Sequence, residues 1–226
     1  MKPRALATVV EPEPRSLAER AYHAIVHMIT QLELVPGSLI VEKELTEDLE
    51  IGRTPVREAL QRLAMEGLVV HQLNRGMFVA DITASGVQQI YEFRSLIDGQ
   101  VVRLAAQRAS RTQVDELEEV HEALVKAIDD DDADAYVALD RCFYRVLADC
   151  AQNVYLAEVI PRIFNQHLRL WFFISSRRGE WRDVARSHSE MIGDVVRAVR
   201  NRNSDEAELA IKSYISGRHK DMRDLL

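Results

Sequence analysis

The chain has 226 residues, 47% of them apolar, and a formal net charge of −7. The apolar fraction is typical of a globular protein and argues against a disordered chain, and no apolar run approaches the roughly 20 residues that cross a bilayer, so we expect no membrane span. The two cysteines, Cys142 and Cys150, have neither a metal-binding nor a redox spacing. We expect free thiols, and therefore a cytoplasmic location.

The N-terminal segment predicts a tail followed by one helix. Residues 1–15 contain three prolines and no continuous apolar stretch, which favours a flexible polar tail over a signal peptide. Apolar residues at helical spacing predict a helix over residues 17–34. Ser16 is suited to cap it, with Glu19 completing a capping box, and Pro36-Gly37 ends it.

The next segment predicts a compact helix-turn-helix with a hairpin. A short helix over residues 42–50 precedes a tight turn and a second helix over residues 54–66. Two short strands follow, over residues 68–72 and 77–80, joined by Asn74-Arg75-Gly76, whose residue types suit a turn with positive φ. The order helix, helix, turn, helix, hairpin is that of a winged helix-turn-helix.

The remainder predicts helix throughout and no internal repeat. Six short helices over about 140 residues favour an antiparallel bundle. We therefore expect a mainly α protein with a flexible tail at 1–15, a winged helix-turn-helix with a small β-hairpin at 16–81, and an all-α bundle at 82–226. The six helices are expected near 84–109, 112–128, 134–150, 153–176, 181–201 and 204–224.

The charge distribution shows where DNA binding would have to occur. Residues 1–81 contain 9 basic and 12 acidic residues, a net charge of −3, and the rest of the chain carries −4. Binding to phosphate therefore needs a local positive surface, because the bulk charge repels DNA. Residues 51–62 provide one, with Arg53, Arg57 and Arg62 against Glu58 alone.

The second helix of a helix-turn-helix enters the major groove with its N-terminal residues against the bases. Arg53 and Arg57 are four residues apart and share a face of that helix, and arginine can read guanine with two hydrogen bonds. An Arg-Gly pair at a hairpin tip suits a wing that enters the minor groove or grips phosphate. The predicted DNA-contacting residues are Lys43, Arg53, Thr54, Arg57, Arg75 and Gly76.

Four stretches resemble a known family. PGSLIVEKELTEDLEIGRTPVREALQRLAMEGLVVHQLNRGMFVADIT looks like the winged helix of the GntR family of bacterial regulators. IYEFRSLIDGQVVRLAAQRAS, DADAYVALDRCFYRVLADCAQNVYLAEVI and SHSEMIGDV resemble the helical effector domain, called FCD, of its FadR-like branch. The resemblance spans nearly the whole chain and implies a ligand-responsive transcriptional regulator.

That branch often holds a divalent metal through one Asp and three His, and the metal helps to hold a small carboxylate effector. Asp140 and His188 fall on two of those positions, whereas Tyr144 and Tyr214 stand where the family has His. Because a neutral phenol is a poor ligand for zinc or nickel, no cofactor is certain.

Three interpretations of these positions remain open. Asp140 and His188 bind a divalent metal weakly, with help from His219 or His167; or the site binds its effector directly, with both tyrosines donating hydrogen bonds; or the groups are polar members of the core. Arg94 is a candidate clamp for a carboxylate. The candidate effector residues are Arg94, Asp140, Tyr144, His188 and Tyr214, and the candidate metal ligands are Asp140, His188 and His219.

We expect a homodimeric repressor that binds a pseudo-palindromic operator in double-stranded DNA and responds to a small carboxylate metabolite, with no enzymatic activity. A rival hypothesis is an enzyme built on the bundle, with Asp140 and His188 as its acid-base pair and the N-terminal domain as an attachment module. A third is an architectural DNA-binding protein without a ligand.

Overall fold

The computed structural model describes residues 16–178 and 181–226, and the predicted tail at 1–15 lies outside them. The described residues form two compact units. One comprises residues 16–83 with 165–173, and the other comprises residues 84–164 with the described part of 174–226. None of the helices in these ranges combines the length and the apolarity that crossing a membrane requires.

The N-terminal unit is a winged helix-turn-helix. Helices α1 (Leu17–Thr30), α2 (Glu42–Asp48) and α3 (Arg53–Met65) accompany a three-stranded antiparallel sheet in the order β1-β3-β2. Its strands are β1 (Leu39–Ile40), β2 (Val69–Gln72) and β3 (Gly76–Val79). Helices α1 and α3 pack on each other through buried aliphatic side chains, and this core includes Ala21, Ile25, Ile29, Val56, Leu60, Leu63 and Leu68.

Local signals in the sequence account for the ends of these elements. The Ser16 hydroxyl accepts a hydrogen bond of 3.1 Å from the amide of Glu19, which satisfies one of the open donors at the start of α1. At the hairpin, Asn74 and Gly76 have φ values of 62° and 104°, as the turn residues predicted. The predicted winged helix is confirmed.

Strand β1 was not predicted. It has two residues, with Leu39 opposite Phe78 and Ile40 opposite Met77 on β3. A strand of this length cannot show the alternation of apolar and polar residues by which strands are found in a sequence, and it is defined only by its pairing with a distant strand. The small β-hairpin expected from the sequence is therefore the larger part of a three-stranded sheet.

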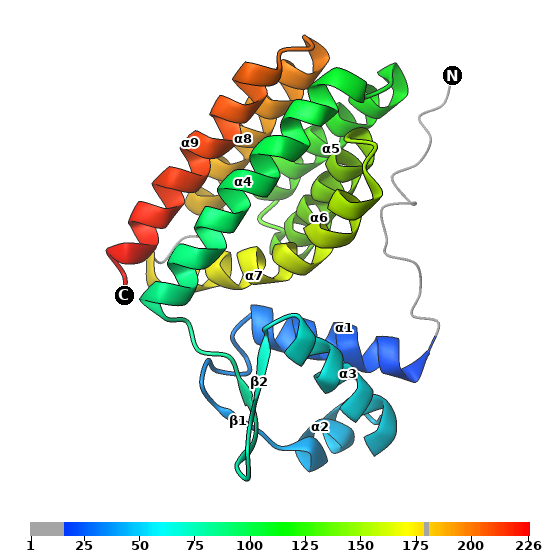
Figure 1. Cartoon of the computed structure of the whole chain (residues 1–226), viewed down its shortest axis with the longest axis vertical. Coiled ribbons are helices and arrows are strands. Elements are labelled where there is room, and N and C mark those ends of the chain that lie inside the picture. Colours follow the sequence, from blue (N-terminus) through cyan, green and yellow to red (C-terminus); the bar gives the residue numbers. More distant parts are fainter. Residues whose placement is uncertain (1–15, 179–180) are drawn as a thin grey trace. The chain divides into compact units, whose positions relative to one another are not determined.

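The second part of the chain is all helical, as predicted. Its helices are α4 (Ala84–Arg108), α5 (Arg111–Asp129), α6 (Ala133–Cys150), α7 (Val154–Arg178), α8 (Trp181–Arg200) and α9 (Ser204–Arg223). Helix α4 packs along α9, and α5 packs against α6 and α8 (Figure 1). Because α4 also contacts α6 and α8, its inner face meets side chains from three other helices in the middle of the bundle.

Both cysteines are free and buried in α6, as expected from their spacing. Burial raises the pKa of the Cys150 thiol to about 12, so almost none of it is thiolate at pH 8. We predict that Cys150 reacts with a thiol-directed chromogenic disulfide only as fast as the protein unfolds. Rapid reaction of a Cys142→Ser variant at pH 8, with Cys150 as its single thiol, would contradict this packing.

Candidate functional site

The predicted DNA-contacting surface lies at the start of α3. Gly52 is its N-cap and provides no side-chain hydrogen bond, so the first amides of the helix are not capped by a side chain. Arg53 and Thr54, on the first turn, are both exposed. Uncapped amides, the positive end of the helix dipole and an exposed guanidinium together suit a phosphate or a base edge.

Two further cations beside this helix end are exposed but paired. The Arg57 Nε donates to Glu42 Oε2 at 2.7 Å, with 62% of the arginine side chain exposed. Lys43 lies 3.7 Å from Glu47 and is 72% exposed. Such surface pairs are weak, so either cation can exchange its carboxylate for a DNA phosphate.

Arg62, the third arginine of the positive segment, has a structural role. Its guanidinium lies 3.6 Å above the centre of the Tyr22 ring, and its Nε donates to Glu66 at 3.2 Å. The local positive surface is therefore smaller than the sequence suggests, and it rests on Arg53 and Arg57. At the hairpin tip, Arg75 is exposed and lies 5.6 Å from the centre of the Phe78 ring.

A second group of predicted residues gathers in the core of the bundle. Arg94, on α4, is 2% exposed, and its Nε and Nη2 donate to Asp98 Oδ2 at 2.9 Å and to Tyr144 Oη at 3.0 Å. Burial alone would lower the pKa of Arg94, but the Asp98 carboxylate and the neighbouring tyrosines, Tyr144 first, together outweigh it, so that the pKa is raised. Arg94 is thus a permanent positive charge inside the bundle.

His188, on α8, is fully buried between two tyrosine rings. Its ring stacks on Tyr214 of α9, with centres 5.1 Å apart, and on Tyr144 of α6, with centres 6.2 Å apart. Its Nδ1 lies 2.9 Å from Tyr136 Oη and its Nε2 lies 3.4 Å from Tyr144 Oη. Burial, followed by the positive charges of Arg94 and Arg218, lowers the pKa of His188 to about 3, so the ring is neutral at pH 7.

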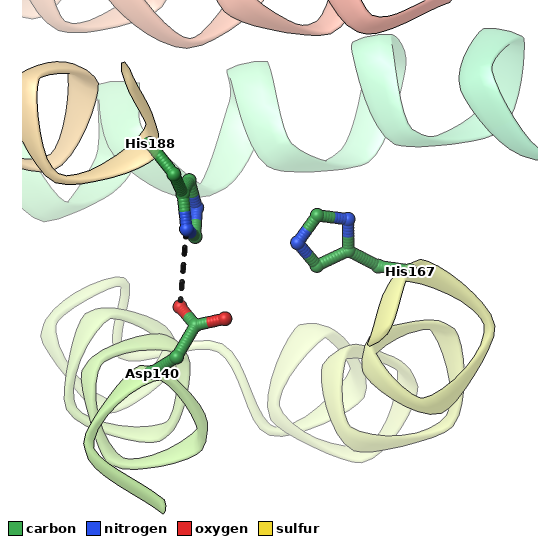
Figure 2. A group of neighbouring side chains, drawn as sticks. All are labelled: Asp140, His167 and His188. Atoms are coloured by element: carbon green, nitrogen blue, oxygen red, sulfur yellow. Dashed lines mark ion pairs between the residues drawn. The ribbon is translucent and has the colours of Figure 1, made fainter. Parts of the chain in front are cut away.

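Asp140, on α6, faces His188 (Figure 2). Its Oδ1 lies 3.8 Å from His188 Nδ1, which is too long for a hydrogen bond, and a neutral ring makes no ion pair. Burial raises the pKa of Asp140 to about 7, although Arg94 and Arg141 act in the opposite direction. The Asp140 Oδ1 atom and the Tyr214 Oη atom are both buried and have no hydrogen-bond partner within the described ranges.

The comparisons with known proteins identify the chain. Residues 17–79 match the family model for bacterial regulatory proteins of the gntR family, and residues 89–217, more than half of the chain, match that of the FCD domain. The chain belongs to the GntR family of bacterial regulators. It is a transcriptional regulator with a DNA-binding helix-turn-helix domain and an FCD domain, as the resemblance of its sequence predicted.

The curated relatives of this GntR regulator are transcriptional regulators, and the alignments cover most of both chains. It is 29% identical to the HTH-type transcriptional repressor RspR of Escherichia coli, over 83% of this chain and 92% of the relative. It is also 29% identical to the Nta operon transcriptional regulator of Aminobacter aminovorans, over 80% and 82% of the two chains. The structure of Escherichia coli McbR/YncC shares the fold, with a TM-score of 0.79, 19% identity, and coverage of 93% of this chain and 98% of that one.

The GntR regulator contains a possible His/Asp site, because Asp140, His167 and His188 offer donor atoms that all lie within 4.8 Å of one another (Figure 2). Zinc bonds of about 2.0–2.2 Å place the donors of one ion within about 4.4 Å of each other. Both ring nitrogens of His188 already lie within hydrogen-bonding distance of phenol oxygens. An ion would have to displace one of these phenols, so the present arrangement does not fit a tightly held metal.

The structure also shows partners that the sequence reasoning missed. Asp98 neutralises Arg94 from the next turn of α4, an i, i+4 spacing that was visible in the sequence. Tyr136 and Arg218 face His188 and Tyr214 without any local signal that singles them out. His167 is in the His/Asp group, whereas His219 is not, and its ring instead stacks on Tyr91 at 5.3 Å.

Proposed function

We propose that this GntR regulator is a homodimeric repressor that binds a pseudo-palindromic operator and releases it when a small carboxylate metabolite binds in the FCD domain. Two-fold symmetry places the α3 helices of both subunits in successive major grooves. Arg53, Thr54 and Arg57 contact bases and phosphates there, Lys43 contacts the backbone, and Arg75-Gly76 forms the wing tip.

The observation that carries the DNA-binding part is the exposure of these cations around an uncapped helix start. A chain with a net charge of −7 can approach DNA only where its positive groups are accessible. Had Arg53 and Arg57 been buried like Arg94, no guanidinium would be available at the groove. Their positions at the surface therefore support the assignment of α3 as the recognition helix.

The effector part rests on the buried polar cluster. A permanent cation at Arg94 suits a carboxylate, and the hydroxyls of Tyr144 and Tyr214 can hydrogen-bond to it without a metal. A ligand changes the DNA affinity only by binding one arrangement of the dimer better than the other. A ligand in this cluster would contact α4, α6, α8 and α9 together, so it could favour one arrangement of these helices over another.

The DNA-binding proposal is tested by fluorescence anisotropy on the DNA upstream of the protein's own gene, with a scrambled duplex as the control. We expect sequence-preferring binding at sub-micromolar protein and moderate salt, and a stoichiometry of two chains per operator. Equal binding of both duplexes over the whole salt range would favour the architectural alternative.

A substitution at the centre of the cluster tests the sensor. In His188→Ala, the ring between Tyr144 and Tyr214 is removed, so both hydroxyls lose their positions. We predict at least a tenfold higher concentration of carboxylate effector for half-maximal release of the operator. The measurement is an anisotropy titration normalised to the operator affinity of the same variant without effector. An unchanged midpoint would place the effector outside this cluster.

A further inference from the structure

Among the three acids Asp98, Asp140 and Asp221, only Asp140 lacks a close ion pair with an arginine, although Arg94 and Arg141 act on it from farther away. Arg94 and Asp98 form a pair in which both side chains are 2% exposed. Arg218 pairs with Asp221 at 2.8 Å. Asp140 is 2% exposed, and no lysine or arginine of the described ranges lies within 4.0 Å of its carboxylate. The one basic side chain of the described ranges within that distance is His188, which is 0% exposed.

The unpaired Asp140 carboxyl restricts the ligand. A ligand with only a carboxylate supplies no N–H donor for the buried Asp140 Oδ1 and brings a second acidic group toward it. A ligand that also carries an ammonium group would give Asp140 a donor and a positive partner, while its carboxylate accepts hydrogen bonds from the Arg94 guanidinium. In a metal-containing site of this kind an ion would supply the positive charge, but both nitrogens of His188 are engaged by phenols here.

The two tyrosines change the chemistry of the site from ion ligation to hydrogen bonding. A phenol oxygen is a good acceptor for an ammonium N–H, and the face of a tyrosine ring attracts a cation. The Tyr214 side chain is buried, with 9% of the residue exposed, and its hydroxyl has no hydrogen-bond partner among the described residues. The Asp140 Oδ1 atom is likewise buried and has no hydrogen-bond partner among them. An ammonium group would satisfy both oxygens.

We propose that the effector is a small zwitterion of the amino acid class, whose ammonium group binds Asp140 and Tyr214 while its carboxylate binds Arg94. This inference rests on the proposed function, since it specifies the class of carboxylate that the FCD domain senses. The two ends of such a ligand meet opposite charges in one cluster. A plain carboxylate of the same size leaves Asp140 Oδ1 without a hydrogen-bond donor and binds more weakly.

The test is a thermal-shift screen of the full chain after treatment with a chelator. The probes are the twenty common L-amino acids, with plain carboxylic acids that lack the amine as matched controls, for example L-leucine against 4-methylpentanoate and L-glutamate against glutarate. Each pair is measured with and without added zinc. We expect at least one amino acid to raise the melting temperature without zinc, and its amine-free counterpart to bind at least tenfold more weakly by calorimetry.

Two variants localise the ammonium group. Tyr214→Phe removes one hydroxyl, and we expect about tenfold weaker binding of the amino acid with little change for the amine-free acid. Tyr155→Phe, at a tyrosine that is 78% exposed on α7, is the matched control and should bind like the parent. Circular dichroism and the melting temperature without ligand show that each variant is folded.

The outcomes separate this inference from the proposed function. If the amine-free acids bind as well as the amino acids, or if binding appears only with zinc, the zwitterion proposal is overturned and the carboxylate sensor stands. If no acid of either kind stabilises the protein with or without zinc, both the zwitterion and the carboxylate sensor are overturned. Equal loss of both ligands in Tyr214→Phe assigns that hydroxyl to the carboxylate and also contradicts the proposal.

Discussion

Replacing Arg53 or Arg57 by alanine will weaken operator binding by roughly 1–3 kcal/mol each, which is about five- to 150-fold in the dissociation constant. Each guanidinium is at the surface beside the start of α3, where it can reach a base edge or a phosphate. Because neither side chain contributes to the core, the melting temperature should stay within a few degrees of the parent. Anisotropy with operator DNA and a thermal melt measure both effects.

The salt dependence adds a second criterion. An arginine that contacts phosphate reduces the slope of log affinity against log salt by about one when it is removed, whereas one that reads a base relaxes sequence preference. Arg197→Ala on α8 is the matched control, since its side chain is 70% exposed and belongs to the bundle. If Arg53→Ala and Arg57→Ala bind operator as well as Arg197→Ala does, α3 is not the recognition helix.

The sequence predicted the winged helix well because its determinants are local. The Ser16 cap, the positive φ of Asn74 and Gly76, and the apolar spacing of α1 and α3 are each set within a few residues. Strand β1 has no such determinant, because two residues become a strand only when β3 supplies the partner. Arg62 shows the same limit, since its role depends on Tyr22, which lies forty positions earlier.

The residues of the buried polar cluster were predicted only in part, because their contacts also depend on distant segments of the chain. Asp140, Tyr144, His188 and Tyr214 were found through a family resemblance, and no spacing rule brings residues of α6, α8 and α9 together. Hydrogen-bond partners such as Tyr136 follow from how helices pack, which a single sequence does not specify. The consequence is functional, because the phenols at His188 decide whether its lone pair is available to a metal.

Arg94 belongs to a buried ion pair and is also the proposed contact of the effector carboxylate, and we expect its removal to destabilise the fold strongly. In Arg94→Met, the Asp98 carboxylate remains buried without its guanidinium, and losing one partner of a buried pair typically costs about 3–5 kcal/mol. We expect a loss of this size in the free energy of unfolding, measured by urea denaturation with circular dichroism. Arg103→Met on the same helix is the control: its partners Asp205 and Glu208 are at the surface, where water screens the pair, so its loss should be much smaller.

A double variant distinguishes the physical causes of the stability loss in Arg94→Met. If the loss in Arg94→Met comes from the uncompensated Asp98, then Arg94→Met with Asp98→Leu should recover most of the stability, because a buried ion pair is often replaced by apolar side chains without loss. If the double variant stays as unstable as the single one, the contact of Arg94 with Tyr144 matters more than the ion pair. Recovered stability together with lost ligand binding would show that the charges of the cluster are retained for the effector rather than for the fold.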